Sequence, residues 1–111
     1  MDTWARQLAC AVTICDREGT ILDMNDKAAE TFAGDGWRGL ISTSLFDCHG
    51  PESQAKIRDM MGRQAVNAYT IEKNGRKKLI YQTPWYEDGR FMGLVELSLE
   101  IPFDLPHFRR D

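Results

Sequence analysis

Two turn signals in the last third of the chain restrict the fold more than any other feature. The Asn74-Gly75 pair is typical of a β-hairpin, because both residues tolerate the backbone that a two-residue turn requires. A second turn signal, EDGR, stands at 87–90. The runs on either side, 66–73, 77–86 and 91–101, are therefore expected to form a three-stranded antiparallel meander that ends at Pro102.

The last of these strands alternates apolar and polar residues. One face would carry Phe91, Gly93, Val95, Leu97, Leu99 and Ile101, and the other Glu96, Ser98 and Glu100. The pattern of the other two strands is mixed, so the sequence leaves open which of their faces points inward.

The stretch ICDREGTILDMNDKAAETF, at 14–32, predicts a hairpin followed directly by a helix. Asp16 favours the start of a turn, and Gly19 tolerates a left-handed backbone. Asn25 or Asp26 can cap a helix over 27–32, since either side chain can accept hydrogen bonds from the first helical amides. We expect strands over 9–15 and 20–24.

A long helix is expected over 51–64, where Pro51 suits the first turn. Its spacing places Ile57, Met60, Met61 and Gln64 on one side. The order is two strands, a helical middle and three strands, which predicts an α+β domain with helices on one face of an antiparallel sheet.

A chain of 111 residues has the length of one domain with one core. We divide it into an N-terminal helical cap or dimer segment (1–9), the domain itself (10–101) and a C-terminal tail (102–111). In the first segment Trp4, Leu8 and Ala9 would form one apolar patch on a helix. Trp4 and Leu8 are therefore our candidate dimer contacts.

Charge and cysteine usage restrict the partners and the compartment. The net charge is −3, and the short RKK run at 76–78 fits a hairpin tip better than a nucleic-acid groove. There is neither a membrane-spanning apolar run nor a leader-like start. Three cysteines without a Cys-x-x-Cys motif fit a reducing compartment, so we expect a cytoplasmic protein.

Three segments together resemble the Per-Arnt-Sim (PAS) family of sensory domains. They are ICDREGTILDMNDKAAETF, STSLFDCHGPES and the closing GRFMGLVELSLEI. The resemblance covers about residues 10–101 and implies a five-stranded antiparallel sheet of order 2-1-5-4-3, often with a cavity under the helices. The sequence departs from the family pattern at Ser42, a position where family members often have Gly.

The resemblance also implies a role in signalling. PAS domains commonly sense a small molecule, redox state or light, form dimers and act on an output domain. The resemblance therefore implies a homodimer. If this chain is the complete protein, we expect it to signal through a partner protein. The alternatives are a ligand-free interaction module and a thiol redox switch at Cys48; no legible catalytic constellation favours an enzyme.

A ligand pocket would be bounded by Trp37, Phe46, Met60 and Met61 on the helical side. On the strands Tyr69, Tyr81, Gln82 and Thr83 would supply polar contacts, although each of these residues could equally fill the core.

Cys48 and His49 form the chemically richest pair, and we include both among the candidate ligand contacts. Cys48 precedes a helix start, which can stabilise a thiolate, but the simpler interpretation is a structured turn in which His49 bonds to nearby backbone. The motifs do not support a cofactor. The long helix lacks the histidine of haem-binding PAS domains, and Leu45 stands where flavin-binding members have their reactive cysteine. Zinc held by Cys10, Cys15, His49 and His107 lacks the usual paired spacing, so no metal site is expected.

Overall fold

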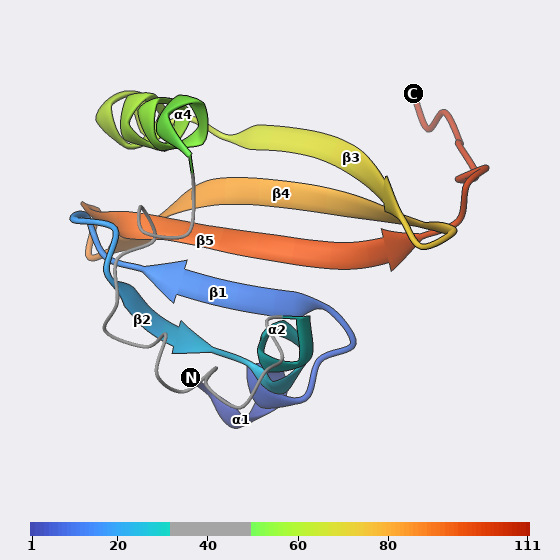
Figure 1. Cartoon of the computed structure of the whole chain (residues 1–111), viewed down its shortest axis with the longest axis horizontal. Helices are drawn as coiled ribbons and strands as arrows, with labels where there is room; N and C mark the ends of the chain where they lie inside the picture. The colour runs from blue at the N-terminus through green and yellow to red at the C-terminus, as the bar shows by residue number, and fades with distance from the viewer. Residues whose placement is uncertain (32–49) are drawn as a thin grey trace.

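The computed structural model describes residues 1–31 and 50–111. In chain order the elements are α1 (Thr3–Arg6), β1 (Ala11–Cys15), β2 (Ile21–Met24), α2 (Asp26–Thr31), α4 (Pro51–Arg63), β3 (Asn67–Lys73), β4 (Arg76–Glu87) and β5 (Arg90–Ile101). The strands form one five-stranded antiparallel sheet in the order β2-β1-β5-β4-β3 (Figure 1). The predicted α+β class and sheet order are confirmed.

The C-terminal meander is built on the two predicted turns. Asn74 and Gly75 have φ angles of 55° and 75°, and Asp88 and Gly89 have φ angles of 51° and 77°. Two successive left-handed residues give the hairpin turn whose twist matches that of the flanking strands. The long β4–β5 pair therefore follows from local turn chemistry.

The opening hairpin is closed by the side chain of Asp16. Its Oδ1 accepts hydrogen bonds from the N–H groups of Glu18 and Thr20, each at 2.9 Å. Gly19 adopts a φ of 83° in this turn. The hairpin places β2 at one edge of the sheet, and α2 follows directly.

Asn25 caps helix α2 and joins three further segments to it. Its Oδ1 accepts from the N–H groups of Ala28 (3.0 Å) and Val12 (2.9 Å). Its Nδ2 donates to the carbonyls of Ala5 (3.0 Å) and Cys10 (2.8 Å). The side chain is 0% exposed, so water cannot replace these partners.

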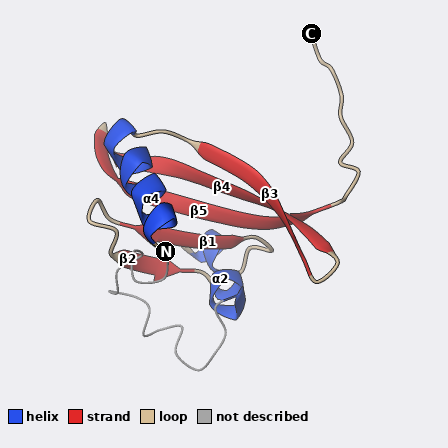
Figure 2. Cartoon of the chain, turned by 45° about the horizontal axis from the view of Figure 1, so that its top comes forward, coloured by secondary structure: helices blue, strands red, loops and turns tan. Residues whose placement is uncertain are grey.

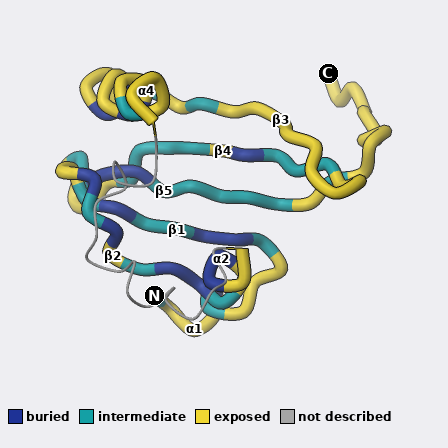
Figure 3. Tube along the Cα trace, in the orientation of Figure 1, coloured by how far each residue is buried: buried dark blue, intermediate teal, exposed yellow. Residues whose placement is uncertain are grey.

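Helices α2 and α4 pack on the same face of the sheet at separate places (Figure 2). One cluster joins Ala28 of α2 to Ala11, Ile21 and Met24, and the other joins Ile57, Met60 and Met61 of α4 to Cys15 and Leu94. Burial is greatest in β1, β2 and α2, whereas β3 is largely exposed (Figure 3). The predicted apolar side of the long helix is confirmed for its three apolar members.

Two expectations about local geometry are wrong. Helix α1 ends at Arg6, so Leu8 and Ala9 lie beyond it and share no helical face with Trp4. Phe91 does not share the face of Leu97, because a register shift between Trp85 and Tyr86 interrupts the alternation. Phe91 packs instead against the cluster under α4.

Candidate ligand cavity

A cavity of about 300 Å³ lies on the helix-bearing face of the sheet, with Thr31 of α2 and Ile57 of α4 in its wall. Four strands contribute most of its described lining: Ala11, Thr13 and Cys15 of β1, Tyr69, Ile71 and Lys73 of β3, Lys78, Ile80 and Gln82 of β4, and Leu94, Glu96 and Ser98 of β5. This volume is at the lower end of the range for small-molecule sites. The cavity therefore suits a compact organic molecule.

The polar side of strand β5 faces this cavity. Leu94 packs under α4, and the alternating residues Glu96 and Ser98 also line the cavity. By the same alternation Leu97 and Leu99 point to the opposite face of the sheet. An amphipathic strand usually turns its apolar side toward the covering helices. Here the cavity receives the polar side, and the apolar side faces away from α2 and α4.

A hydrogen-bonded ladder runs from Asn67 on the edge strand β3 to two residues that line the cavity, Gln82 of β4 and Glu96 of β5. Asn67 Nδ2 donates to Gln82 Oε1 at 3.0 Å, and Gln82 Nε2 donates to Glu96 Oε2 at 2.8 Å. The three side chains are cross-strand neighbours in register. Among the described residues the second carboxylate oxygen of Glu96, Oε1, has no partner. The ladder orients Glu96 and leaves one acceptor available.

Burial and charge in the cavity shift the pKa values of two lining groups. The pKa of the Tyr69 phenol is raised, chiefly by burial and also by the negative charge of Glu96. The pKa of the Cys15 thiol is raised by burial, an effect that the hydrogen bond from the Leu94 amide partly offsets. Tyr69 therefore stays protonated as a hydrogen-bond donor at neutral pH, and Cys15 is a thiol rather than a reactive thiolate.

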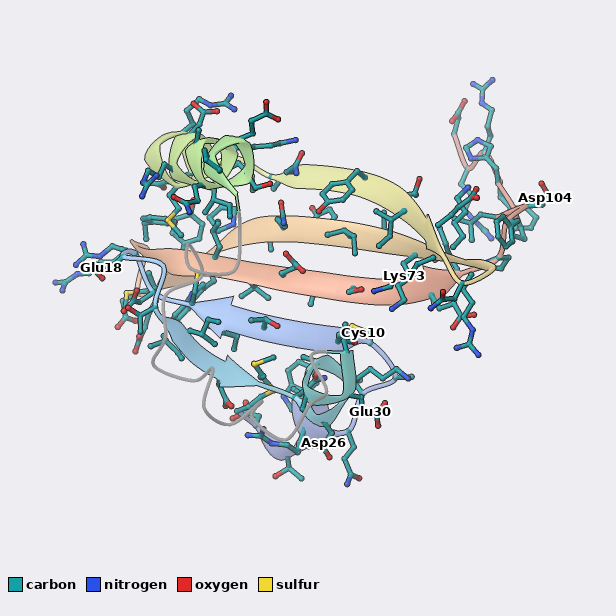
Figure 4. All side chains as sticks on the ribbon, in the orientation of Figure 1. Cys10, Glu18, Asp26, Glu30, Lys73 and Asp104 are labelled. Carbon is teal, nitrogen blue, oxygen red and sulfur yellow. The ribbon has the colours of Figure 1, made fainter. Side chains whose placement is uncertain are left out.

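Two lysines stand at the end of the cavity nearest the β3–β4 hairpin. Lys78 lies opposite Ile71 and Glu100, and Lys73 is the last residue of β3. Figure 4 shows Lys73 remote from helix α4. The nearby Glu100 forms an ion pair with Arg76 at 3.5 Å. Within residues 1–31 and 50–111 no carboxylate forms an ion pair with either lysine.

The predicted pocket residues divide into four groups. Tyr69 and Gln82 do line the cavity, whereas Met60 and Met61 belong to the packed cluster beside it. Tyr81 and Thr83, which pair with Leu97 and Val95, are not among the residues that line this cavity. Trp37, Phe46, Cys48 and His49 lie outside the described residues, so the thiol switch at Cys48 stays a prediction.

The sequence interpretation missed Glu96, Lys78 and Thr13 as cavity residues. Glu96 had a signal, because it falls on the polar side of the alternating strand β5, whereas β4 mixes apolar and polar residues on both of its sides. The sequence interpretation left the inward face of β3 and β4 open. Knowing which side the helices cover was needed to choose that face.

The described part of the chain contains no cluster of three or more His, Cys, Asp or Glu side chains suited to a metal ion. Cys15 ends strand β1, and Cys10 precedes its first residue, so the strand itself separates the two thiols. Among the same residues no helix is both long and apolar enough to cross a bilayer.

Structural comparison identifies the fold, although no protein-family model or curated protein matches the sequence. The PAS domain of the histidine kinase ThkA superposes with a TM-score of 0.65 at 15% identity, covering 82% of this chain and 98% of that one. The PAS domain of Bordetella pertussis BvgS gives 0.62 at 14% identity, covering 89% and 82%. The Vibrio cholerae VqmA dimer gives 0.67 at 15%, covering 87% of this chain and 48% of that one. The chain therefore has a PAS-like fold.

Proposed function

We propose that this domain is a PAS-type sensor that binds a small molecule in the cavity and signals through another protein chain. The observation that carries the proposal is the Asn67–Gln82–Glu96 ladder, which orients two polar side chains, Gln82 and Glu96, in the lining of the cavity. Polar side chains cost free energy when they are removed from water, unless hydrogen bonds replace that water. A cavity that served only as core would be stabler with apolar residues at these positions.

The form of the cavity supports a binding role rather than catalysis. Apolar residues such as Ile57, Ile80 and Leu94 surround a small number of oriented polar groups, which is the usual composition of a ligand site. One solved domain of similar fold belongs to a histidine kinase, ThkA, which supports a signalling role for this chain. We propose that this role is cytoplasmic.

Filling the cavity is expected to abolish ligand binding. Ser98 lies on the cavity side of β5 opposite Ile80, so Ser98→Phe would occupy the space above the ladder. We expect a small-molecule extract of the host to raise the melting temperature of the original protein but not of Ser98→Phe. Differential scanning fluorimetry measures both.

Leu99→Phe is the matched control, because the neighbouring residue of the same strand points to the opposite face. It should keep the full response to the extract. An equal response in Ser98→Phe and Leu99→Phe would place the binding elsewhere, and no response in the original protein would argue against a sensor for a host metabolite.

We also propose a homodimer that uses the N-terminal segment. Trp4 is 72% exposed and Leu8 is 37% exposed, and large apolar side chains at such exposure favour a protein contact. The similar domain of VqmA belongs to a dimer. We expect the double substitution Trp4→Ala, Leu8→Ala to shift the mass measured by light scattering from dimer to monomer; a chain that stays dimeric would exclude these contacts.

A ligand-free interaction module is the second candidate. The apolar side of β5, with Leu97 and Leu99, faces away from α2 and α4, and its neighbour Tyr81 is 36% exposed. A partner protein could cover this face. An intact dimer with no response to any small molecule would favour this function over a sensor.

A further inference from the structure

We propose that the cavity selects a small zwitterion, with its amine at Glu96, its carboxylate at Lys73 and Lys78, and an apolar body between them. This inference rests on the proposed function and names the ligand class that the same cavity would take. It follows from the separation of charges along the cavity and from the apolar side chains between those charges.

Glu96 supplies the amine site. Its carboxylate is held at the cavity floor by the 2.8 Å hydrogen bond from Gln82, and Oε1 has no partner among the described residues. Thr13 is its cross-strand neighbour and also lines the cavity. A carboxylate in a partly enclosed site is stabilised by a donor that carries positive charge. An ammonium group is both a hydrogen-bond donor and positively charged.

Lys73 and Lys78 supply the carboxylate site. Both line the cavity, and within the described ranges the carboxylate nearest in register, Glu100, forms its ion pair with Arg76. Two ammonium groups near one another repel, and an anion between them removes that repulsion. The hairpin end of the cavity therefore favours a ligand carboxylate.

The strand register sets the length of the ligand. Glu96 lies opposite Gln82 and Glu100 lies opposite Lys78, so the two sites are four residues apart along β5. At ~3.3 Å per residue this is about 13 Å between backbone positions. The flexible lysine stems shorten the span to roughly 10 Å between the charged groups of a ligand. Tyr69 and Ile80 line the cavity at the level between the two sites.

Isothermal titration calorimetry with a series of ω-amino acids tests this geometry. The probes are 4-aminobutanoate, 6-aminohexanoate and 8-aminooctanoate, with octanoate and octylamine as single-charge controls. The longest amino acid, about 10 Å between its charged groups, should bind best, at least about tenfold tighter than either single-charge control. Glu96→Gln and the double variant Lys73→Met, Lys78→Met should each weaken it about tenfold or more.

Lys77→Met is the control variant. It also removes a lysine charge, but Lys77 pairs with Ile101 on the other face of the sheet. It should change the dissociation constant by less than about twofold. Octanoate or octylamine binding as tightly as 8-aminooctanoate would overturn the zwitterion and leave the sensor intact. If no probe binds but the host extract still stabilises the protein, the zwitterion is likewise overturned and the sensor left intact. Failure of the probes and the extract together would overturn both proposals.

Discussion

Asn25→Ala is expected to be among the most destabilising single substitutions in this domain. The side chain makes four hydrogen bonds to the backbone of Ala5, Cys10, Val12 and Ala28, and none of it is exposed. Truncation leaves the buried N–H groups of Val12 and Ala28 without their side-chain acceptor, and it removes one hydrogen bond from each of the Ala5 and Cys10 carbonyls. We expect the free energy of unfolding to fall by about 3–5 kcal/mol, a large part of the stability of a domain of this size.

Urea denaturation followed by circular dichroism measures this loss. Asn67→Ala is the control, since Asn67 donates one hydrogen bond from a half-buried position on edge strand β3. It should cost less than about 1 kcal/mol. If Asn25→Ala were as mild as Asn67→Ala, the joining role of Asn25 would be wrong.

Gly93→Ala should disrupt the junction between strand β5 and the opening hairpin. A Cβ atom on Gly93 would lie 2.0 Å from the carbonyl oxygen of Cys15 and 2.7 Å from the carbonyl carbon of Asp16. Both are backbone atoms, and Trp85 Nε1 donates to the same Cys15 oxygen at 3.0 Å. The glycine also has a φ of 148°, which side chains disfavour. We expect a loss of about 3 kcal/mol or more.

Gly62→Ala is the same glycine-to-alanine change, but we expect it to stabilise the domain. Gly62 lies inside helix α4, and nothing stands within 4 Å of an added Cβ. Alanine should stabilise the domain by about 0.5–1 kcal/mol, because it favours the helix over the unfolded chain. Thermal and urea melts of the two variants should move in opposite directions. A well-folded Gly93→Ala with the original midpoint would contradict the described packing.

The sequence predicted the features that depend on neighbouring residues. The Asn74-Gly75 and Asp88-Gly89 turns follow from the backbone preferences of those four residues, and they determine which strands pair in the meander. The sequence offered two residues that could cap helix α2, Asn25 and Asp26, and the structure shows that Asn25 is the cap. Its bonds to Ala5 and Cys10 could not be predicted, because they connect segments 20 and 15 residues away.

The candidate site was predicted less completely, for a physical reason. Gln82 and Thr83 are adjacent, yet only Gln82 lines the cavity, since side chains alternate across a strand. The choice between them requires knowing which face the helices cover. The amphipathic pattern of β5 does not make this choice on its own, because the polar residues Glu96 and Ser98 line the cavity.

Native mass spectrometry tests the central claim, a small molecule bound in the cavity, most directly. The protein should be purified from its own host and compared with a denatured sample, with an absorbance spectrum of both. We predict an additional noncovalent mass in the original protein and its absence in Ser98→Phe. An identical, unliganded mass in native and denatured samples, together with no stabilisation by the host extract, would contradict the claim and favour the interaction module.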